Sequence, residues 1–312
     1  MIRIFNKNTF LIHNIKEVFF MQNNTNNNKT KYITDMADER VDEYKKIYNL
    51  SYIDGIKVKS RSNKTHNITT VEVLDENGKQ ALGKDIGKYI TLEIKNVLTL
   101  EDEEIEDITN SLSEALVTLI ENNINKVMVV GLGNETVTAD SLGPKVIKNI
   151  NVTRHVIKYM KELVEPGTRE ITALSPGVLG TTGIETEEII ESVVERIKPD
   201  LIIVIDSLAS QSITRIGTTI QMGNTGITPG AGVGNRRKSL NKNNLKIPVI
   251  AIGVPTVVDA EVLLKEMLDK LNISSVKKNK KLWDNMVVTP KEIDSLITKM
   301  TKIISDSINI AI

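Results

Sequence analysis

The stretch that decides the fold runs from Lys126 to Pro144 and reads KVMVVGLGNETVTADSLGP. Its apolar first half is typical of a buried parallel strand, which Gly131 and Gly133 bring to an end. In sheets of parallel strands, the loops beyond the carboxyl ends of the strands form the ligand crevice. We therefore expect Asp140 to lie in a cleft, ahead of a helix that begins near Pro144.

A second apolar run, residues 201–206, reads LIIVID and ends in Asp206. If this run is a parallel neighbour of the first, Asp140 and Asp206 reach the same edge of the sheet. Two aspartates in one cleft suit acid/base chemistry. Asp206 has a second interpretation, because an aspartate after a strand often caps the next helix, here residues 207–209. These residues alone support the catalytic and the capping interpretations equally.

The rest of the sequence places this strand pair in an α/β fold. The pattern after Pro144 alternates between helical and strand-like segments, which predicts a mostly parallel sheet sandwiched by helices. An additional small antiparallel element is predicted upstream, from alternating segments separated by turn-forming residues. Strands are predicted at 69–74, 89–94, 127–130, 171–174, 201–205 and 247–252, a turn at 75–78, and helices from 99 to 120, from 144, from 184 to 197, and from a capping box at 289–292.

The composition excludes several classes of protein. The 312 residues include 40 basic and 40 acidic side chains, so no net field attracts the chain to nucleic acid. The absence of cysteine excludes a disulfide framework and a thiol nucleophile. No apolar run approaches the roughly 20 residues that cross a bilayer. We expect a cytoplasmic protein that binds neither nucleic acid nor membrane.

Other catalytic and cofactor signatures are incomplete. The third glycine of a dinucleotide fingerprint that starts at Gly131 would fall on Thr136, and the glycine-rich residues 224–238 contain no Gly-Lys-Ser/Thr of a phosphate loop. No His-Glu-x-x-His or Gly-x-Ser-x-Gly motif occurs. We therefore expect no cofactor and no metal. The alternative to acid/base catalysis by the two aspartates is a metal site formed by Asp140, Asp206 and a third ligand such as His155 or Glu185.

The motifs resemble those of the germination proteases, which degrade small acid-soluble spore proteins in spore-forming bacteria. The resemblance extends over about residues 32 to 312, with one departure, a region between Asp259 and Met286 that is shorter than in bacillus-type members. The matching segments are residues 131–134, 138–144, 152–155, 176–186, 199–200, 206–209, 224–227, 229–235, 250–260 and 286–292.

This resemblance implies a fold similar to that of hydrogenase maturation proteases and an atypical aspartic endopeptidase whose catalytic residues are Asp140 and Asp206. It implies small acid-soluble spore proteins as substrates, a homotetramer, and action in the cytoplasm of the forespore and spore core. It also implies an inactive precursor that removes its own N-terminal segment. Two alternatives remain. One is a metal-dependent peptidase of the hydrogenase-maturation type, which would use the metal site described above. The other is a non-catalytic spore protein that presents the glycine-rich loop to a partner.

The N-terminal region carries a candidate processing site. Residues 34–39 read TDMADE and resemble the sequence that the family cleaves in its substrates, and the asparagine-rich residues 22–30 before them predict a flexible tether. We expect self-cleavage between Asp35 and Met36, faster in acid, which makes residues 1–35 a propeptide and tail and residues 36–312 a single peptidase domain. The alternative is an acidic helix that begins with Thr34 as its cap.

Overall fold

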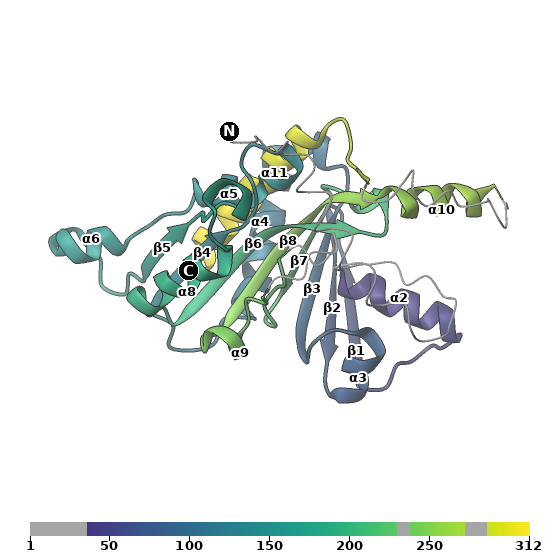
Figure 1. The fold of residues 1–312 in the computed structure, drawn as a ribbon, viewed down its shortest axis with the longest axis horizontal. Helices are drawn as coiled ribbons and strands as arrows, with labels where there is room; N and C mark the ends of the chain where they lie inside the picture. The colour runs from purple at the N-terminus through teal and green to yellow at the C-terminus, as the bar shows by residue number, and fades with distance from the viewer. Residues whose placement is uncertain (1–35, 230–237, 272–285) are drawn as a thin grey trace, which may run out of the picture. The chain divides into compact units, whose positions relative to one another are not determined.

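The computed structural model describes residues 36–229, 238–271 and 286–312, which belong to one compact unit, Ile33–Ile312. The strands of this part form one nine-stranded sheet in the order β1-β2-β3-β7-β8-β6-β4-β5, with β9 paired to β8 (Figure 1). The strands are β1 (Ile56–Ser62), β2 (His66–Val73), β3 (Gly87–Ile94), β4 (Lys126–Gly131), β5 (Glu170–Leu174), β6 (Leu201–Ser210), β7 (Thr219–Gly223), β8 (Val249–Asp259) and β9 (Val287–Val288).

Helices and short 3-10 turns connect these strands. The helices are α2 (Ala37–Tyr48), α3 (Glu76–Leu82), α4 (Asp102–Val117), α5 (Leu142–Ile147), α6 (Arg154–Tyr159), α7 (Leu179–Thr182), α8 (Thr186–Ile197), α9 (Lys242–Leu245), α10 (Ala260–Lys270) and α11 (Ile293–Ala311). The 3-10 turns are η1 (Val97–Thr99), η2 (Thr138–Asp140), η3 (Lys161–Leu163) and η4 (Ile213–Arg215).

The predicted α/β class is confirmed. Strands β8, β6, β4 and β5 run parallel, and β4 lies directly beside β6, with Gly131 opposite Ile205. The antiparallel element is larger than predicted and belongs to the same sheet, because β7 joins β3 to β8 through antiparallel pairs on both sides. The sheet is therefore continuous from the N-terminal hairpin to the parallel strands.

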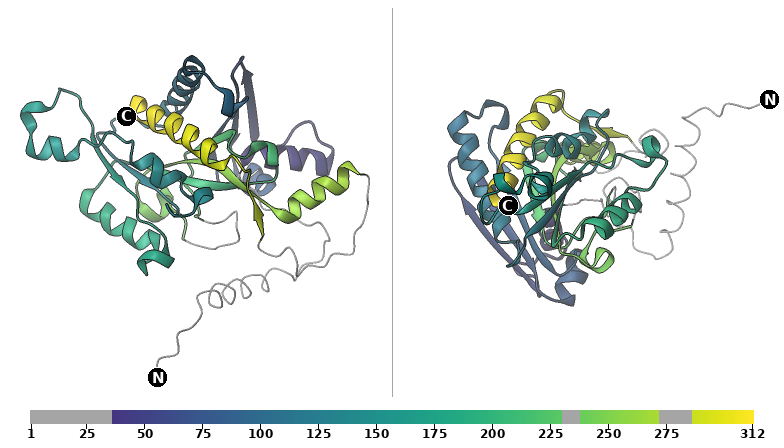
Figure 2. Two further views of the ribbon diagram at one scale, coloured as in Figure 1. Left: turned by 90° about the horizontal axis from the view of Figure 1, so that it is seen from above. Right: turned by 90° about the vertical axis from the view of Figure 1, so that its left-hand side faces the viewer.

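Helices α4, α5 and α11 lie on one face of the sheet (Figure 1). Helices α4 and α11 pack against each other, and α5 contacts both β4 and β6, as Figures 1 and 2 show. The apolar side chains of α11 recur at three- and four-residue spacing, and Met300, Ile303 and Ile304 have no exposed surface. Burial of each such side chain stabilises the fold by roughly 1.5–3 kcal/mol. This helical layer supports β4 and β6 from one side of the sheet.

Among the described residues, helices pack on the opposite face at its two ends. At one end, α8 and α9 pack on the alternating side chains of β4 and β6, among them Met128 and Val204. At the other end, α2 and α3 pack on β1 to β3, where Val71 and Tyr89 line the contact. Strands β7 and β8 lie between these two layers. The candidate site lies over β7 and β8, between the two helical layers.

Three local predictions were wrong. Residues 75–78 do not form a turn: the Asp75 side chain accepts a hydrogen bond from the Gly78 N–H and caps α3. The capping box at 289–292 does not form, since the Thr289 hydroxyl donates to the Thr256 carbonyl of β8 and α11 begins at Ile293. Residues 207–209 are not helical, because β6 continues through Ser210.

Candidate functional site

A cleft of about 590 Å³ opens over β7, β8 and β6 between the two helical layers. Its floor is formed by Gly223, Ala251 and Gly253, whose side chains are absent or too small to fill the space between the two helical layers. A Cβ atom at Gly253 would lie 2.5 Å from the Cγ atom of Leu208, so even alanine would crowd this floor. The small residues thus create the hollow into which longer polar side chains project.

Asp140 reaches the cleft from a tight loop that follows β4. The backbone N–H of Asn134 donates to both the Asp140 carbonyl, at 3.0 Å, and its Oδ2 atom, at 2.8 Å. Gly133 has a φ of +110°, and a Cβ atom there would lie 2.1 Å from the Asp140 carbonyl oxygen. Glycine is therefore required for the backbone to fold back and hold the carboxylate in place.

Asp206 projects from the interior of β6 rather than from its end. It is 7% exposed, and its Oδ1 atom accepts a hydrogen bond of 2.9 Å from the Ser207 N–H. The capping interpretation fails here, because β6 runs on to Ser210 and residues 207–209 belong to the strand. Strand β4 ends at Gly131, opposite Ile205, so Asp206 lies just past the end of its neighbour. Because β4 ends before it reaches Asp206, β4 does not cover the edge of β6 beside this carboxylate.

Both aspartates of the predicted pair border one cleft. Asp140 and Asp206 both line the same cleft, and the 3-10 turn η2 that ends in Asp140 contacts β6 and β8. Of the predicted processing site, Met36 is fully buried and begins the described chain, and Asp35 lies outside the described residues. The helix behind it begins at Ala37 with Met36 at the capping position, without a side-chain cap.

The other titratable side chains that line the described part of the cleft are Arg40, Lys84, Asp85 and Tyr89. Burial raises the pKa of Tyr89 to about 12, and its hydroxyl donates to the Asp85 carbonyl at 3.0 Å. Tyr89 is therefore protonated at neutral pH and cannot act as a general base. Asp140 and Asp206 are the lining carboxylates that sit beside the small-residue floor.

The geometry does not assemble the ligand set of the metal-dependent alternative. His155, on α6, and Glu185, before α8, are not among the residues that line the cleft with the two aspartates. Over the described ranges there is no group of three or more His, Cys, Asp or Glu side chains that could hold a metal ion.

The described ends of the glycine-rich segment 224–238 contribute to the cleft. Residues 225–229 and Ser239 line the cavity, and the bridge between Ile227 and Leu240 closes the base of the loop. Residues 230–237, which hold most of its glycines, lie outside the described residues.

Two polar residues near the cleft were not anticipated. Gln221, on β7, accepts a 2.6 Å hydrogen bond from the backbone N–H of Ala37. Arg215, on η4, binds acidic residues at the start of α2. Neither residue belongs to a motif. The one available signal was Gln221 itself, a glutamine within the mainly apolar segment Thr219–Gly223.

Comparison with known proteins assigns the family. The sequence pattern described as germination protease matches residues 32–273. The chain belongs to the germination protease family. It is 42% identical to the germination protease of Clostridium tetani over 306 residues, which cover 89% of this chain and 94% of that protein. It is 46% identical to the Bacillus subtilis germination protease over 221 residues, which cover 70% of this chain and 60% of that protein.

Family membership makes the chain a peptidase of the germination protease family. Among solved structures, a NiFe hydrogenase maturation protease from Thermococcus kodakarensis is similar at a TM-score of 0.35 and 16% identity, covering 62% of this chain and 97% of that one. The fold assignment rests on the sheet order rather than on this likeness. In the described part of the chain, no helix has the length and apolar character that crossing a membrane requires.

Proposed function

We propose that this peptidase is an endopeptidase whose catalytic groups are Asp140 and Asp206. The observation that carries the proposal is the convergence of both carboxylates on one cleft, each oriented by a backbone N–H donor. A water molecule between them would lose a proton to the ionised carboxylate as it attacks the peptide carbonyl. The protonated partner would donate to the carbonyl oxygen, and like charges at short range keep one proton on such a pair.

The proposed substrates are the small acid-soluble spore proteins, in the cytoplasm of the forespore and spore core. Membership of the germination protease family supports this substrate class. We further propose that the enzyme acts as a homotetramer. The proposed chemistry uses no metal and no cofactor, and it involves no direct contact with nucleic acid or membrane.

The chain is also proposed to be made as a precursor that cleaves itself between Asp35 and Met36. Two contacts support this site. The Ala37 N–H is bonded to Gln221, a residue that lines the cleft, and Arg40 lines the same cleft one helical turn later. These contacts hold the start of α2 against residues that line the cleft, which supports cleavage on the N-terminal side of Met36. Processing should be faster in acid, because the mechanism needs one aspartate protonated.

The test is incubation of the purified chain with a small acid-soluble spore protein, followed by mass measurement of the fragments. The proposal predicts discrete internal cleavages that persist after exhaustive chelation. Loss of cleavage on chelation, with recovery on adding a divalent metal, would favour the metal-dependent alternative instead. An intact substrate recovered as a stable complex would favour the non-catalytic binding protein.

A further inference from the structure

The first turn of α2 buries two carboxylates that would ordinarily lie in water. Asp38 is 8% exposed and Glu39 is 9% exposed, whereas Asp42, one turn later on the same helix, is exposed. Acidic residues are common in the first turn of a helix, where the N–H groups favour them, but that role does not require burial. A buried carboxylate costs free energy unless a charged partner compensates it.

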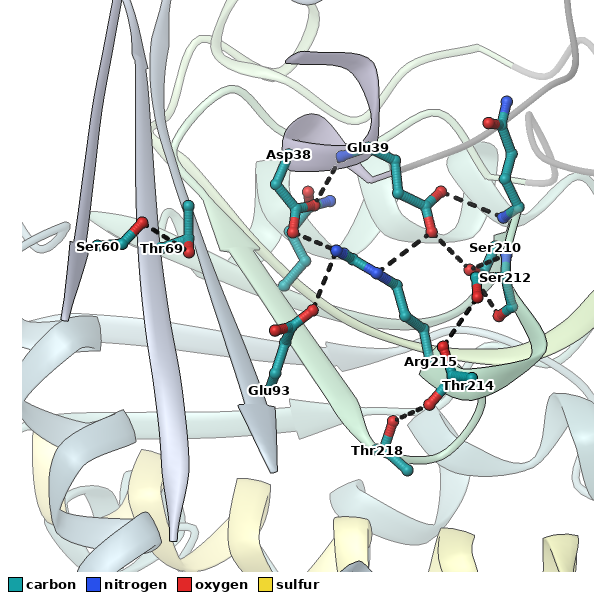
Figure 3. A network of polar contacts seen from close by, with 12 residues as sticks. Asp38, Glu39, Ser60, Thr69, Glu93, Ser210, Ser212, Thr214, Arg215 and Thr218 are labelled. Carbon is teal, nitrogen blue, oxygen red and sulfur yellow. Dashed lines mark hydrogen bonds and ion pairs between the residues drawn. The ribbon is translucent and has the colours of Figure 1, made fainter. Parts of the chain in front are cut away.

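The partner is Arg215, which Figure 3 shows at the centre of three carboxylates. The NH1 atom of Arg215 lies 2.6 Å from Asp38 Oδ2, and its Nε atom lies 3.5 Å from Glu39 Oε1. The third carboxylate is Glu93, 3.0 Å from NH2. Burial by itself lowers the pKa of Arg215, but the three carboxylates outweigh it and the pKa is raised, so the guanidinium stays charged.

Glu39 is held by two further donors from the end of β6. The Ser210 hydroxyl donates to Glu39 Oε1 at 2.8 Å, and the Gln211 N–H donates to Oε2 at 3.1 Å. Ser210 lies four positions beyond Asp206 on the same strand. The start of α2 is thus tied to the strand that carries a candidate catalytic aspartate.

We propose that Arg215, with Asp38, Glu39 and Glu93, forms a latch that positions the Asp35–Met36 bond for self-cleavage. Arg215 acts in this scheme as a positioning residue, and the inference rests on the proposed function. Asp38 and Glu39 are the second and third residues after Met36. Fixing them, together with the Ala37 N–H on Gln221, restricts how far Met36, the first residue that the structure describes, can move relative to the cleft.

Loss of the latch should slow self-cleavage strongly, because small misplacements of a reacting group can cost about a hundredfold in rate. Removal of one partner from a buried ion pair also leaves uncompensated charge, which drives the segment out of its site. We expect Arg215→Gln and Asp38→Asn each to slow processing of the full chain at least tenfold. Asp42→Asn and Arg61→Gln, which change exposed residues of the same charge, should leave the rate within twofold.

A double variant tests whether Arg215 acts through Asp38. If both belong to one latch, Arg215→Gln with Asp38→Asn should be no slower than the worse single variant. Rate losses that multiply would overturn the proposal, as would processing by Arg215→Gln at the rate of the unmodified chain. If Arg215→Gln fails to fold, Asp38→Asn and Glu39→Gln are compared with Asp42→Asn in the same assay.

Hydrogen exchange tests the latch without relying on catalysis. In a full chain that carries Asp206→Asn, adding Arg215→Gln should speed exchange at residues 37–41 at least tenfold and leave residues 202–205 of β6 unchanged. Equal acceleration in both segments would mean a general loss of structure and would overturn the latch, as would unchanged exchange in both. If the full chain never processes itself, the proposed precursor cleavage fails, and this exchange comparison still decides whether Arg215 holds the start of α2 in place.

Discussion

Asp206 and Gln221 lie in one row across the sheet, each directly opposite Gly253 of β8. Residues opposite one another in neighbouring strands project to the same face, so both side chains rise into the same cleft. Their Cα atoms are two strand spacings apart, about 10 Å. Gln221 accepts a hydrogen bond from the N–H of Ala37, which ties the start of α2 to the strand row that carries Asp206.

This row predicts a role for the Gln221 amide in self-cleavage. Gln221→Met keeps the length of the side chain but removes the acceptor for the Ala37 N–H. Loss of one such hydrogen bond is worth about 1 kcal/mol, so processing should slow by roughly five- to tenfold. The rate is measured from the mass of the N-terminal fragment over time. Gln80→Met, on the exposed side of α3, is the matched control and should have no effect.

The glycine at position 133 should be essential for activity. In Gly133→Ala the Cβ atom would collide with the Asp140 carbonyl oxygen, and the φ of +110° disfavours any side chain. The loop must shift and carry the Asp140 carboxylate with it. We expect substrate cleavage to fall at least a hundredfold and the unfolding free energy to fall by about 1–3 kcal/mol.

Gly180→Ala supplies the comparison for that experiment, since a Cβ atom at Gly180 meets nothing within 4 Å. A Gly133→Ala enzyme that matches Gly180→Ala in its cleavage rate would contradict the role assigned to this loop.

The buried His66 predicts a pH dependence of stability. Burial lowers the pKa of His66 below its usual value of 6.5, and this outweighs the opposing effect of Asp107. The unfolded chain therefore binds more protons than the folded chain between the two pKa values, and stability falls as pH drops below about 6.5. The free energy of unfolding, measured with urea, should differ less between pH 7.5 and pH 5.5 for His66→Gln than for the unmodified chain.

His155→Gln, at an exposed position on α6, should leave that difference unchanged. Equal pH dependence in His66→Gln and the unmodified chain would show that His66 titrates normally.

The layer formed by α11 predicts a contrast between two positions on one helix. Ile304 is fully buried and Ile310 is 59% exposed. Ile304→Ala leaves a cavity in the layer beneath β4 and β6 and should lower the unfolding free energy by about 2–5 kcal/mol. Ile310→Ala should change it by less than about 0.5 kcal/mol. Denaturant unfolding of both variants measures the contrast, and similar losses would mean that α11 is not docked as described.

Sequence reasoning found the parallel strands and the aspartate pair because both depend on local patterns. The apolar runs at β4 and β6 end in glycine or aspartate, and parallel neighbours bring such ends together. It failed where a distant partner decides the local structure. The Thr289 hydroxyl bonds to Thr256 on β8 instead of capping α11, and β6 continues past Asp206 because β8 pairs with it as far as Val258.

The contacts of Arg215 lie beyond sequence reasoning for the same reason. Arg215 and Asp38 are separated by 177 positions, and neither residue belongs to a periodic pattern that points to the other. The short strand β7, Thr219–Gly223, likewise gives no clear alternation, so the link between the antiparallel and parallel strands could not be predicted.

The central claim, catalysis by Asp140 and Asp206, is tested most directly by the rate at which Asp140→Asn and Asp206→Asn full chains cleave a small acid-soluble spore protein. Asparagine keeps the shape of each side chain but can neither accept the water proton nor hold the shared one. We predict that each substitution lowers the rate at least about a thousandfold, with an unfolding midpoint close to that of the unmodified chain. A rate within tenfold of the unmodified chain for either variant would contradict the account.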